Sequence, residues 1–488
     1  MHSYFASKIY QLSFVAAFCS ILALGACSPT PRPYQPSQDP AGAWRNSFAN
    51  DIAVLDEDQK PLVGAQILIG AAQGSIPDNF IVTDASGHVG LPVAWVSAEP
   101  VTIDAPGHLR ATYYAQEPGA RTYQLRKSFG NGQYQVRGLT QGHNIVNKDG
   151  YVDFGLVIPA LTRNDILSFN LDKVISTQMD TIKVAGQELE IPTNVTLPRQ
   201  KETYIVPISL EKPTYQMYFS DSGKHRLFAA RGRFPFKDVV KELRNETPFY
   251  DLINYFEISG GGVKDVDIIG SITAADISVT SLNFARRASV TAPSIGSDET
   301  MLVIGIAEMS GLLFPTDVKK LKSEENRQIS TLDNRALVFS LLKKTADMES
   351  DSSGADRLSA VLLLADGAKP QFLPILPDIR LAGNGDVLIS KINSIGGVNA
   401  LATYSVLSEM REVSQGTAKV TQRRPQWEVY GPAWLDTVAL PEWPEGNPAS
   451  GRRRWEVNLL GSLNASQVEL GPAMINEATH VTHTSLDF

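Results

Sequence analysis

Short apolar stretches that alternate with turn residues dominate the chain from about residue 50 onward. In the segment 61–70, PLVGAQILIG, the apolar side chains of Ala65, Ile67 and Ile69 share one face because strand residues alternate sides with a period of two. Similar apolar runs lie before it at 52–56 and after it at 101–104, and turn sequences separate the runs. Strands of this length and spacing predict an antiparallel β-sandwich in this region.

The β pattern continues beyond residue 134 and is interrupted once by helical spacing. Apolar residues recur at i, i+3, i+4 and i+7 from Phe236 to Leu243 and again from Phe249 to Phe256, with Pro248 between the two series. This spacing predicts a small helical hairpin over 235–258 that packs on a sheet and closes one end of a β core. A role of the hairpin in binding is the alternative.

The remaining sequence also predicts mostly strands. Ser259–Gly262 has the composition of a hinge or domain edge. Apolar runs at 266–273, 300–307, 358–365 and 387–392 are expected strands, whereas 333–348 is expected to be a helix. No internal repeat is evident, so a propeller or solenoid is not favoured. The predicted fold class is therefore mainly β and multi-domain, with an N-terminal Ig-like β-sandwich followed by β-rich domains.

The N-terminus has the layout of a secretory signal peptide. Lys8 precedes an apolar run over 9–24, which as a helix of about 1.5 Å per residue spans roughly 24 Å and is short for a bilayer core of roughly 30 Å. The run ends in Leu24-Gly25-Ala26-Cys27, which resembles the lipobox of bacterial lipoproteins. The resemblance implies cleavage before Cys27 and lipidation of its thiol, and Ser28 at the next position implies sorting to the outer membrane. The alternative is a plain cleaved signal that leaves a free thiol.

The cysteine count and the next segment agree with an anchored chain. Cys19 and Cys27 are the two cysteines, so a disulfide framework and a four-thiolate zinc site are excluded. Cys19 would leave with the signal, and lipidation would cap the remaining thiol. Residues 28–40, SPTPRPYQPSQDP, predict an extended tether that at about 3.1 Å per residue reaches about 40 Å.

Three turn sequences carry a second resemblance. Pro61–Ala65, Thr83–Gly87 and Ala105–His108 occur in the order typical of the carboxypeptidase regulatory-like, or transthyretin-like, family of Ig-type domains, which the segment resembles over about 75 residues. The resemblance implies a spacer or docking module without catalytic residues of its own. An unrelated β-sandwich with similar turns is the alternative.

Together these patterns predict five segments along the chain. They are a signal peptide at 1–26, a lipidated cysteine and proline-rich tether at 27–47, an Ig-like sandwich at 48–127, a β-rich domain with the helical hairpin at 128–262, and a C-terminal β-rich domain at 263–488.

Tryptophans are concentrated near the C-terminus. Trp427, Trp434, Trp443 and Trp455 are four of the six tryptophans, and arginines flank them. Exposed tryptophans beside arginines could stack on the sugar rings of a glycan, which makes these four the candidate ligand-binding residues. Large aromatic side chains that fill β cores, with arginines solvating the turns, are the competing explanation.

Signals for other chemistry are weak. A net charge of -8 at pH 7 lacks the positive field that nucleic-acid binding uses. The motifs of α/β-hydrolases, zinc proteases and P-loop enzymes are absent from the sequence, so no catalytic residue and no cofactor is assigned. His480 and His483 form a close pair, but residues three apart on a strand face opposite sides, so no metal site is predicted.

Two functions remain open from the sequence. The favoured hypothesis is a lipid-anchored, non-enzymatic protein of the outer membrane that acts in binding, adhesion or envelope assembly, with an envelope protein or a glycan as partner. The alternative is a lipid-anchored hydrolase of peptide or polysaccharide with an accessory Ig-like domain. Such modules often accompany catalytic domains, which is a fold-level association only.

Overall fold

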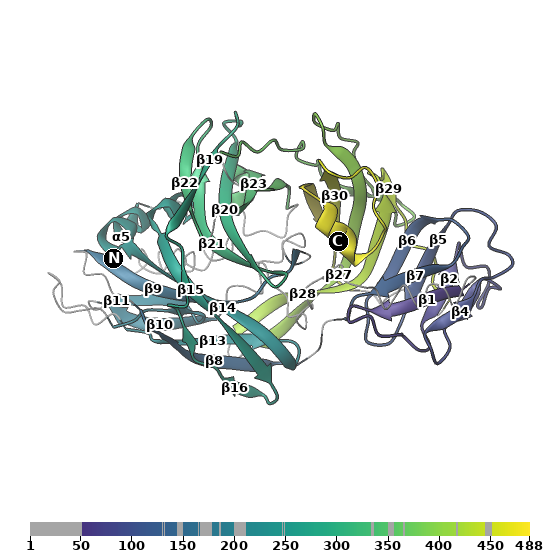
Figure 1. Ribbon diagram of the computed structural model, residues 1–488, viewed down its shortest axis with the longest axis horizontal. Coiled ribbons are helices and arrows are strands. Elements are labelled where there is room, and N and C mark those ends of the chain that lie inside the picture. Colours follow the sequence, from purple (N-terminus) through teal and green to yellow (C-terminus); the bar gives the residue numbers. More distant parts are fainter. Residues whose placement is uncertain are drawn as a thin grey trace.

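The protein is built mainly from β-strands arranged in several sheets, as the computed structural model shows (Figure 1). The structure describes residues 51–128, 130, 132–143, 150–163, 165, 178–184, 187–199, 211–245, 247, 249–332, 336–349, 356–364, 367–415, 418–444 and 451–488. The predicted fold class is confirmed. The signal sequence, Cys27 and the tether lie outside the described residues, so the expectations for them stay predictions.

Residues 51–127 form the first module, a sandwich of two β layers. Its strands are β1 (Asp51–Asp56), β2 (Gln66–Ile69), β3 (Phe80–Val82), β4 (His88–Gly90), β5 (Glu99–Asp104), β6 (Arg110–Gln116) and β7 (Arg121–Leu125). One layer has the order β4-β1-β7, and the other contains β6-β5-β2-β3. Ile52 and Val54 of the first layer and Ile67 and Ile103 of the second are fully buried in one core. The alternating pattern of the sequence therefore forms the predicted sandwich, but β1 and β7 pair in parallel, so the sandwich is not antiparallel throughout.

A turn of this module has the geometry expected from its residues. Asp84 Oδ1 accepts hydrogen bonds from the backbone N–H groups of Ser86 at 2.8 Å and His88 at 3.0 Å. Gly87 has a φ of +76°, a conformation that glycine adopts without strain. The side-chain oxygen and the glycine thus close the turn between β3 and β4.

The middle of the chain forms a second sandwich. Its strands are β8 (Tyr134–Gln141), β9 (Tyr151–Pro159), β10 (Met179–Val184), β11 (Gln187–Pro192), β12 (Val195–Thr196), β13 (Thr214–Phe219), β14 (Gly223–Pro235), β15 (Glu257–Ile268), β16 (Ile272–Ala274), β17 (Ile277–Ser278) and β18 (Leu282–Asn283). The sheet β12-β9-β14-β15-β18 packs on the sheet β13-β8-β16, and both contribute to one core. β10 and β11 pair only with each other among the described strands.

The expected helical hairpin is present between β14 and β15. It consists of α5 (Phe236–Arg244), α6 (Phe249–Leu252) and a short 3-10 turn, η3 (Ile253–Tyr255). Val239, Leu252 and Ile253, three of the residues that set the helical period, are buried in the main core. The hairpin therefore covers part of the β core, as the spacing predicted.

Ser259–Gly262 lies inside strand β15, so the expectation of a hinge at these residues is wrong. Gly260 and Gly261 pair with β14 on one side and with β18 on the other. A Cβ atom at Gly262 would overlap the carbonyl oxygen of Ser278, and one at Gly260 would lie 2.6 Å from the carbonyl oxygen of Leu282. The glycines therefore let the segment with β17 and β18 pass directly over β15. The expected boundary between residues 262 and 263 falls within this strand.

The C-terminal part of the chain adds most of the largest sheet. Its strands are β19 (Arg286–Thr291), β20 (Glu299–Met309), β21 (Leu312–Leu321), β22 (Asn326–Thr331), β23 (Leu337–Lys344), β24 (Leu358–Leu364), β25 (Arg380–Leu381), β26 (Val387–Leu388), β27 (Asn399–Gln415), β28 (Ala418–Pro432), β29 (Thr437–Val438), β30 (Arg453–Ser462) and β31 (His480–Asp487). Two short helical segments accompany them, α7 (Thr345–Glu349) and the 3-10 helix η4 (Pro472–Glu477).

The helix expected over 333–348 is wrong for most of its length. Residues 333–335 lie outside the described residues, 337–344 form β23, and only the short α7 follows it. β23 is paired on both sides, with β20 and with β24. Its two faces are also covered, because Phe339 belongs to one apolar core and Val338 and Leu342 to another. A strand that is covered on both faces is apolar almost throughout, and such a run lacks the period of two that separates strand from helix in a sequence.

One twelve-stranded sheet connects the C-terminal region with the first module. Its order is β21-β20-β23-β24-β31-β30-β27-β28-β6-β5-β2-β3, and Figure 1 shows β6 and β5 continuing the sheet beyond β28. β28 and β6 are parallel, with Trp427 opposite Arg110 and Tyr430 opposite Tyr113. The predicted Ig-like segment and the C-terminal segment thus share one hydrogen-bonded sheet. Among the described residues, no helix has the length and apolar character needed to cross a bilayer.

Candidate functional site

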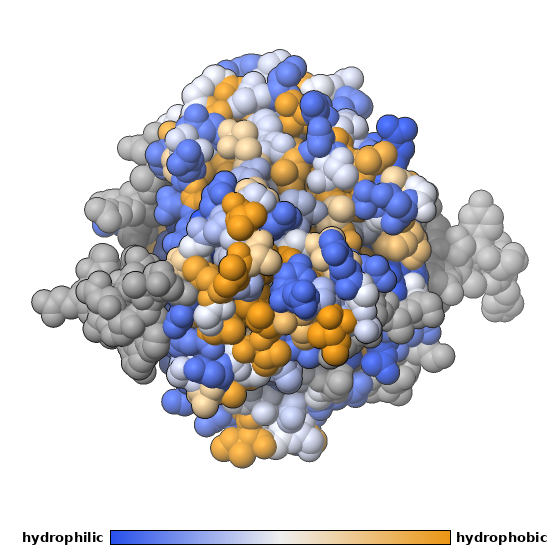
Figure 2. Space-filling view, turned by 90° about the vertical axis from the view of Figure 1, so that its right-hand side faces the viewer, coloured by the Kyte–Doolittle hydropathy of each residue, from blue (hydrophilic) through white to orange (hydrophobic). Residues whose placement is uncertain are grey.

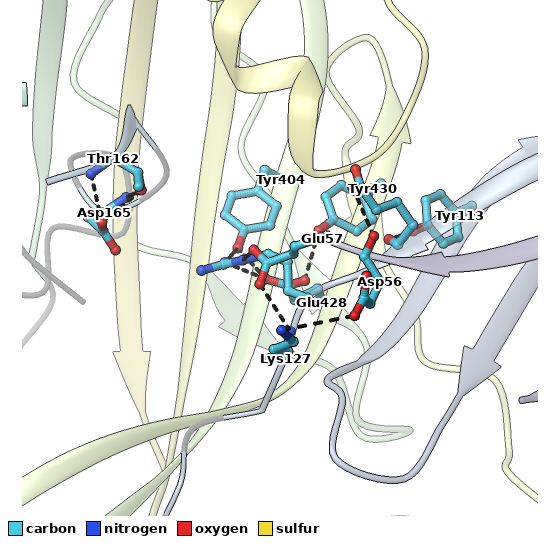
Figure 3. A network of polar contacts seen from close by, with 11 residues as sticks. Asp56, Glu57, Tyr113, Lys127, Thr162, Asp165, Tyr404, Glu428 and Tyr430 are labelled. Atoms are coloured by element: carbon cyan, nitrogen blue, oxygen red, sulfur yellow. Dashed lines mark hydrogen bonds and ion pairs between the residues drawn. The ribbon is translucent and has the colours of Figure 1, made fainter. Parts of the chain in front are cut away.

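A buried ionic network holds the first module against the C-terminal strands (Figure 3). At its centre Glu428, on β28, is only 1% exposed. Its Oε1 accepts hydrogen bonds from Arg126 Nη1 at 2.8 Å and Tyr404 OH at 2.6 Å, and its Oε2 accepts one from Tyr430 OH at 2.7 Å. Both carboxylate oxygens are therefore satisfied by donors from the module and from the sheet.

The electrostatics of this network keep its members in fixed protonation states. Burial raises the pKa of the Tyr404 and Tyr430 hydroxyls, and the charge of Glu428 raises it further, so both tyrosines remain hydrogen-bond donors. For Arg126, burial alone would lower the pKa, but Glu428, Tyr404, Glu57 and Tyr430 together more than offset this effect, and the net pKa is raised. The arrangement is an ion pair in which both oxygens of the carboxylate accept hydrogen bonds, which is the form in which a buried carboxylate is tolerated.

The rim of the network comes from residues near the end of β1. The Glu57 carboxylate lies 3.6 Å from Arg126 Nε, and burial raises the pKa of Glu57 although the charge of Arg126 opposes this shift. Lys127 Nζ lies 2.8 Å from Asp58 Oδ2 and 3.9 Å from Asp56 Oδ2. Acidic residues of the first module thus surround the two consecutive basic residues that follow β7.

A second buried pair lies on the same face of the long sheet. Val406 of β27 is opposite Glu428 on one side and Glu456 on the other, so these two carboxylates face the same way. Glu456 pairs with Arg423 in the interior. Because ion pairs of this kind are costly to bury singly, the two pairs stabilise one particular register of β27, β28 and β30.

The four candidate tryptophans do not form an exposed surface. Trp427, Trp443 and Trp455 are 0%, 1% and 2% exposed, and they belong to one apolar core on the face opposite the ionic network. Trp434 is partly buried and donates its indole N–H to the carbonyl oxygen of Leu460 at 2.7 Å. The expectation that these side chains stack on a glycan is corrected by their burial: Trp427 and Trp455 flank Leu407 on neighbouring strands and fill the core.

An arginine of β6 that contacts two of these tryptophans also has a structural role. The guanidinium of Arg110 lies between the rings of Trp427 and Trp443, at 4.7 Å and 4.5 Å from their centroids, and is paired with Asp104 at 2.9 Å. Trp427 Nε1 donates to Thr112 Oγ1 at 2.9 Å. These contacts join β6 to β28 from the other face of the sheet. The arginine that stacks on these rings comes from β6 and is distant in the sequence, so the arginines at 423–424 and 452–454 that flank the tryptophans did not indicate this joint.

The histidine pair on β31 carries no metal site. His483 Nδ1 is hydrogen-bonded to Asn458 Oδ1 at 2.9 Å, and His480 Nδ1 to Thr479 Oγ1 at 2.8 Å. Burial lowers the pKa of His480 to about 4 and that of His483 to about 3. No group of three or more metal-ligating side chains occurs among the described residues. A cavity of about 30 Å³ beside His480 is lined mainly by apolar atoms and has room for about one water molecule.

The first module exposes an apolar surface that sequence reasoning missed. Its exposed aliphatic residues, here called the apolar face, are Val63, Ile76, Val82, Val93 and Val96. Figure 2 shows hydrophobic side chains gathered near the centre of this side of the molecule. Val93 is 97% exposed and Val96 82%, whereas Trp95 between them is 6% exposed and anchors their loop. Such clustered exposure is typical of a surface that binds something.

The segment 61–109, which contains the residues of the apolar face, carries charged residues of one sign, whereas the exposed Lys60 lies three positions before Val63. Between Lys60 and Arg110 the sequence contains no lysine or arginine, whereas it contains Asp78, Asp84, Glu99 and Asp104. Alternating hydrophobicity could not identify this face, because valine and isoleucine in a β-rich segment are expected to be buried.

Comparisons with known proteins add little to this description. No family model and no curated protein matches the chain. Among solved structures, it is similar to the Bacillus anthracis TIE protein, with a TM-score of 0.15 and 9% identity over 65% of this chain and 48% of the other, about half of that protein's length. It is also similar to BcpA, the major pilin subunit of Bacillus cereus, with a TM-score of 0.14 and 8% identity over 71% and 93% of the two chains. For the pilus-presented adhesin Cpa the TM-score is 0.10, with 8% identity over 66% and 98%. These TM-scores are too low for any of the three proteins to serve as a guide to function.

Proposed function

We propose that the chain is a lipoprotein of the outer membrane that acts as a non-enzymatic binding protein, in adhesion or in assembly of the cell envelope. Cys27 would carry the lipid, and the proline-rich tether would link it to the first module. The observation that carries the binding role is the apolar face, with Val93 and Val96 almost fully exposed. Burial of such side chains at an interface contributes favourably to binding.

The joint between the module and the long sheet supports this role. Because β6 pairs with β28 and Arg126 with Glu428, the apolar face belongs to a rigid body and is not on a freely swinging domain. A rigid, preorganised surface loses less conformational entropy when it binds. The candidate partners remain an envelope protein, a glycan or the membrane itself.

The anchor is tested by mass spectrometry of the protein from its native host. We expect Cys27 to be the N-terminal residue and to carry a diacylglycerol thioether and an acyl chain. An unmodified thiol at Cys27, in protein that is freely soluble without detergent, would overturn the anchor.

The binding role is tested by co-sedimentation with isolated envelopes, with cell-wall glycan and with whole cells. We expect saturable binding that weakens in the double variant Val93→Ser/Val96→Ser. Ile269, which is 85% exposed but lies outside the first module, provides the control variant Ile269→Ser. Equal binding by the unmodified protein, the double variant and the control variant would rule out the apolar face as the binding surface. Turnover of peptide or polysaccharide by the purified protein would support the hydrolase instead.

A further inference from the structure

We infer that the occupant of the apolar face is the lipid bilayer in which the Cys27 anchor sits, so that the first module lies against the membrane surface. The inference rests on the proposed function, because it requires the anchor, and it names the partner of the same surface.

The apolar face lies in the part of the chain closest to the anchor. Cys27 precedes Asp51, the first described residue and the start of β1, by 24 positions. At about 3.4 Å per residue a chain of that length spans at most about 80 Å. The module is therefore confined near the bilayer, where tethering raises its effective concentration at the surface to the millimolar range. Under this confinement a weak apolar contact is enough to hold the face on the lipid.

The composition of the face suits lipid better than a charged partner. Val93, Ala94 and Val96 are exposed on one loop, and the buried Trp95 fixes that loop on the module. A short exposed apolar loop can enter the boundary between headgroups and acyl chains without leaving charged groups desolvated. Val63 and Val82, in and near the strand pair β2 and β3, enlarge the apolar area.

The surrounding charge predicts which lipids are preferred. Because Asp84 and Glu99 are the nearest charged residues before and after the loop 93–96 in the sequence, and Lys60 lies more than 30 positions before that loop, anionic headgroups would be repelled from it. We therefore expect docking on zwitterionic phosphatidylcholine to exceed docking on phosphatidylglycerol. This order is opposite to that of peripheral proteins that bind through basic patches.

The test uses the lipidated full-length protein in vesicles. The mature sequence contains no cysteine besides Cys27, so Val93→Cys can be labelled selectively with an environment-sensitive dye when the lipid blocks Cys27. In phosphatidylcholine vesicles we expect a blue-shifted emission that is quenched by lipids with a nitroxide on the acyl chain. The matched control, Ile269→Cys, should show neither effect. Adding phosphatidylglycerol should reduce the shift at position 93.

Each other outcome overturns the inference. A blue shift that depends on protein density and is not quenched by nitroxide lipids would identify a second copy as the occupant. A water-like emission at position 93 in protein whose Cys27 is lipidated would overturn the docking and leave the anchor intact. An unmodified Cys27 in the same sample, read by mass spectrometry, would overturn the anchor and with it the docking that depends on it.

Discussion

Removal of the positive charge from the buried network should weaken the joint between the first module and the long sheet. In Arg126→Met, the carboxylate of Glu428 would lose its ionic partner while staying 1% exposed. It would keep the hydrogen bonds from Tyr404 at 2.6 Å and Tyr430 at 2.7 Å. Those two neutral donors compensate for only part of the lost ion pair.

The expected loss follows from the burial of the pair. Breaking a buried ion pair by removing one member costs about 3–5 kcal/mol, because the remaining charge is left uncompensated. Since the two tyrosines still solvate Glu428, we expect a value at the lower end, about 3 kcal/mol. In the double variant Arg126→Met/Glu428→Gln the charge of Glu428 is removed together with its partner, whereas Glu57, which lies 3.6 Å from Arg126, still loses its basic neighbour. We therefore expect part of that loss to be recovered.

The assay is urea unfolding at neutral pH followed by tryptophan fluorescence. Trp427 and Trp443 lie against Arg110 at the same joint, so their emission reports on its separation. Arg226→Met is the matched control, because Arg226 Nη2 lies 3.0 Å from Asp265 in a pair whose aspartate side chain is 68% exposed. Loss of an exposed pair of this kind costs about 0–1 kcal/mol.

Two results would refute this reasoning. If Arg126→Met destabilises the joint no more than Arg226→Met does, the buried pair does not hold the module. If the double variant is as unstable as Arg126→Met alone, the unpaired charge of Glu428 is not the cause of the lost stability.

Three further predictions concern the glycines, the histidines and the tryptophans. Gly262→Ala places a Cβ against the Ser278 carbonyl and should lower the free energy of unfolding by roughly 3 kcal/mol or more. Gly270→Ala, where a Cβ meets nothing within 4 Å, should change it by less than about 1 kcal/mol in the same urea experiment. Burial lowers the pKa of His483 to about 3, so below about pH 6.5 the unfolded chain binds a proton that the folded chain does not bind. The free energy of unfolding should therefore fall by about 1.4 kcal/mol per pH unit as the pH decreases toward 3, and urea midpoints between about pH 7 and 5 should depend less on pH in His483→Gln. Trp443→Ala should cost about 3–5 kcal/mol of stability in thermal or urea unfolding and leave any glycan binding measured by calorimetry unchanged, because the ring is buried.

Local pattern was sufficient for much of the fold. Ala65, Ile67 and Ile69 alternate in the sequence and are buried, and the spacing from Phe236 to Phe256 gave the helical hairpin. Local pattern failed where the environment is made by distant strands. Residues 337–344 form a strand that pairs with β20 and β24 on its two edges. Gly262 lies in a strand that pairs with β14, and the approach of Ser278 leaves no room for a side chain there.

The candidate site was harder to anticipate than the fold. Arg126 and Glu428 are 302 residues apart, and nothing in the sequence near either residue indicates that they meet. Trp455 suggested a binding surface because tryptophan serves both cores and interfaces, and only the pairing of β30 with β27 decides between the two. The apolar face was missed for the opposite reason, since Val93 and Val96 look like core residues until their loop is placed in space.

The parallel pairing of β6 with β28 has a consequence for biogenesis. During synthesis β6 leaves the ribosome long before the strand that completes its layer, so the nascent first module exposes an open edge for most of translation. If the chain is exported unfolded, this edge is also unprotected after translocation until the last third of the polypeptide arrives. Such an order of events favours a chaperone that shields the edge, and we expect C-terminal truncations to aggregate even when the first module is intact in sequence.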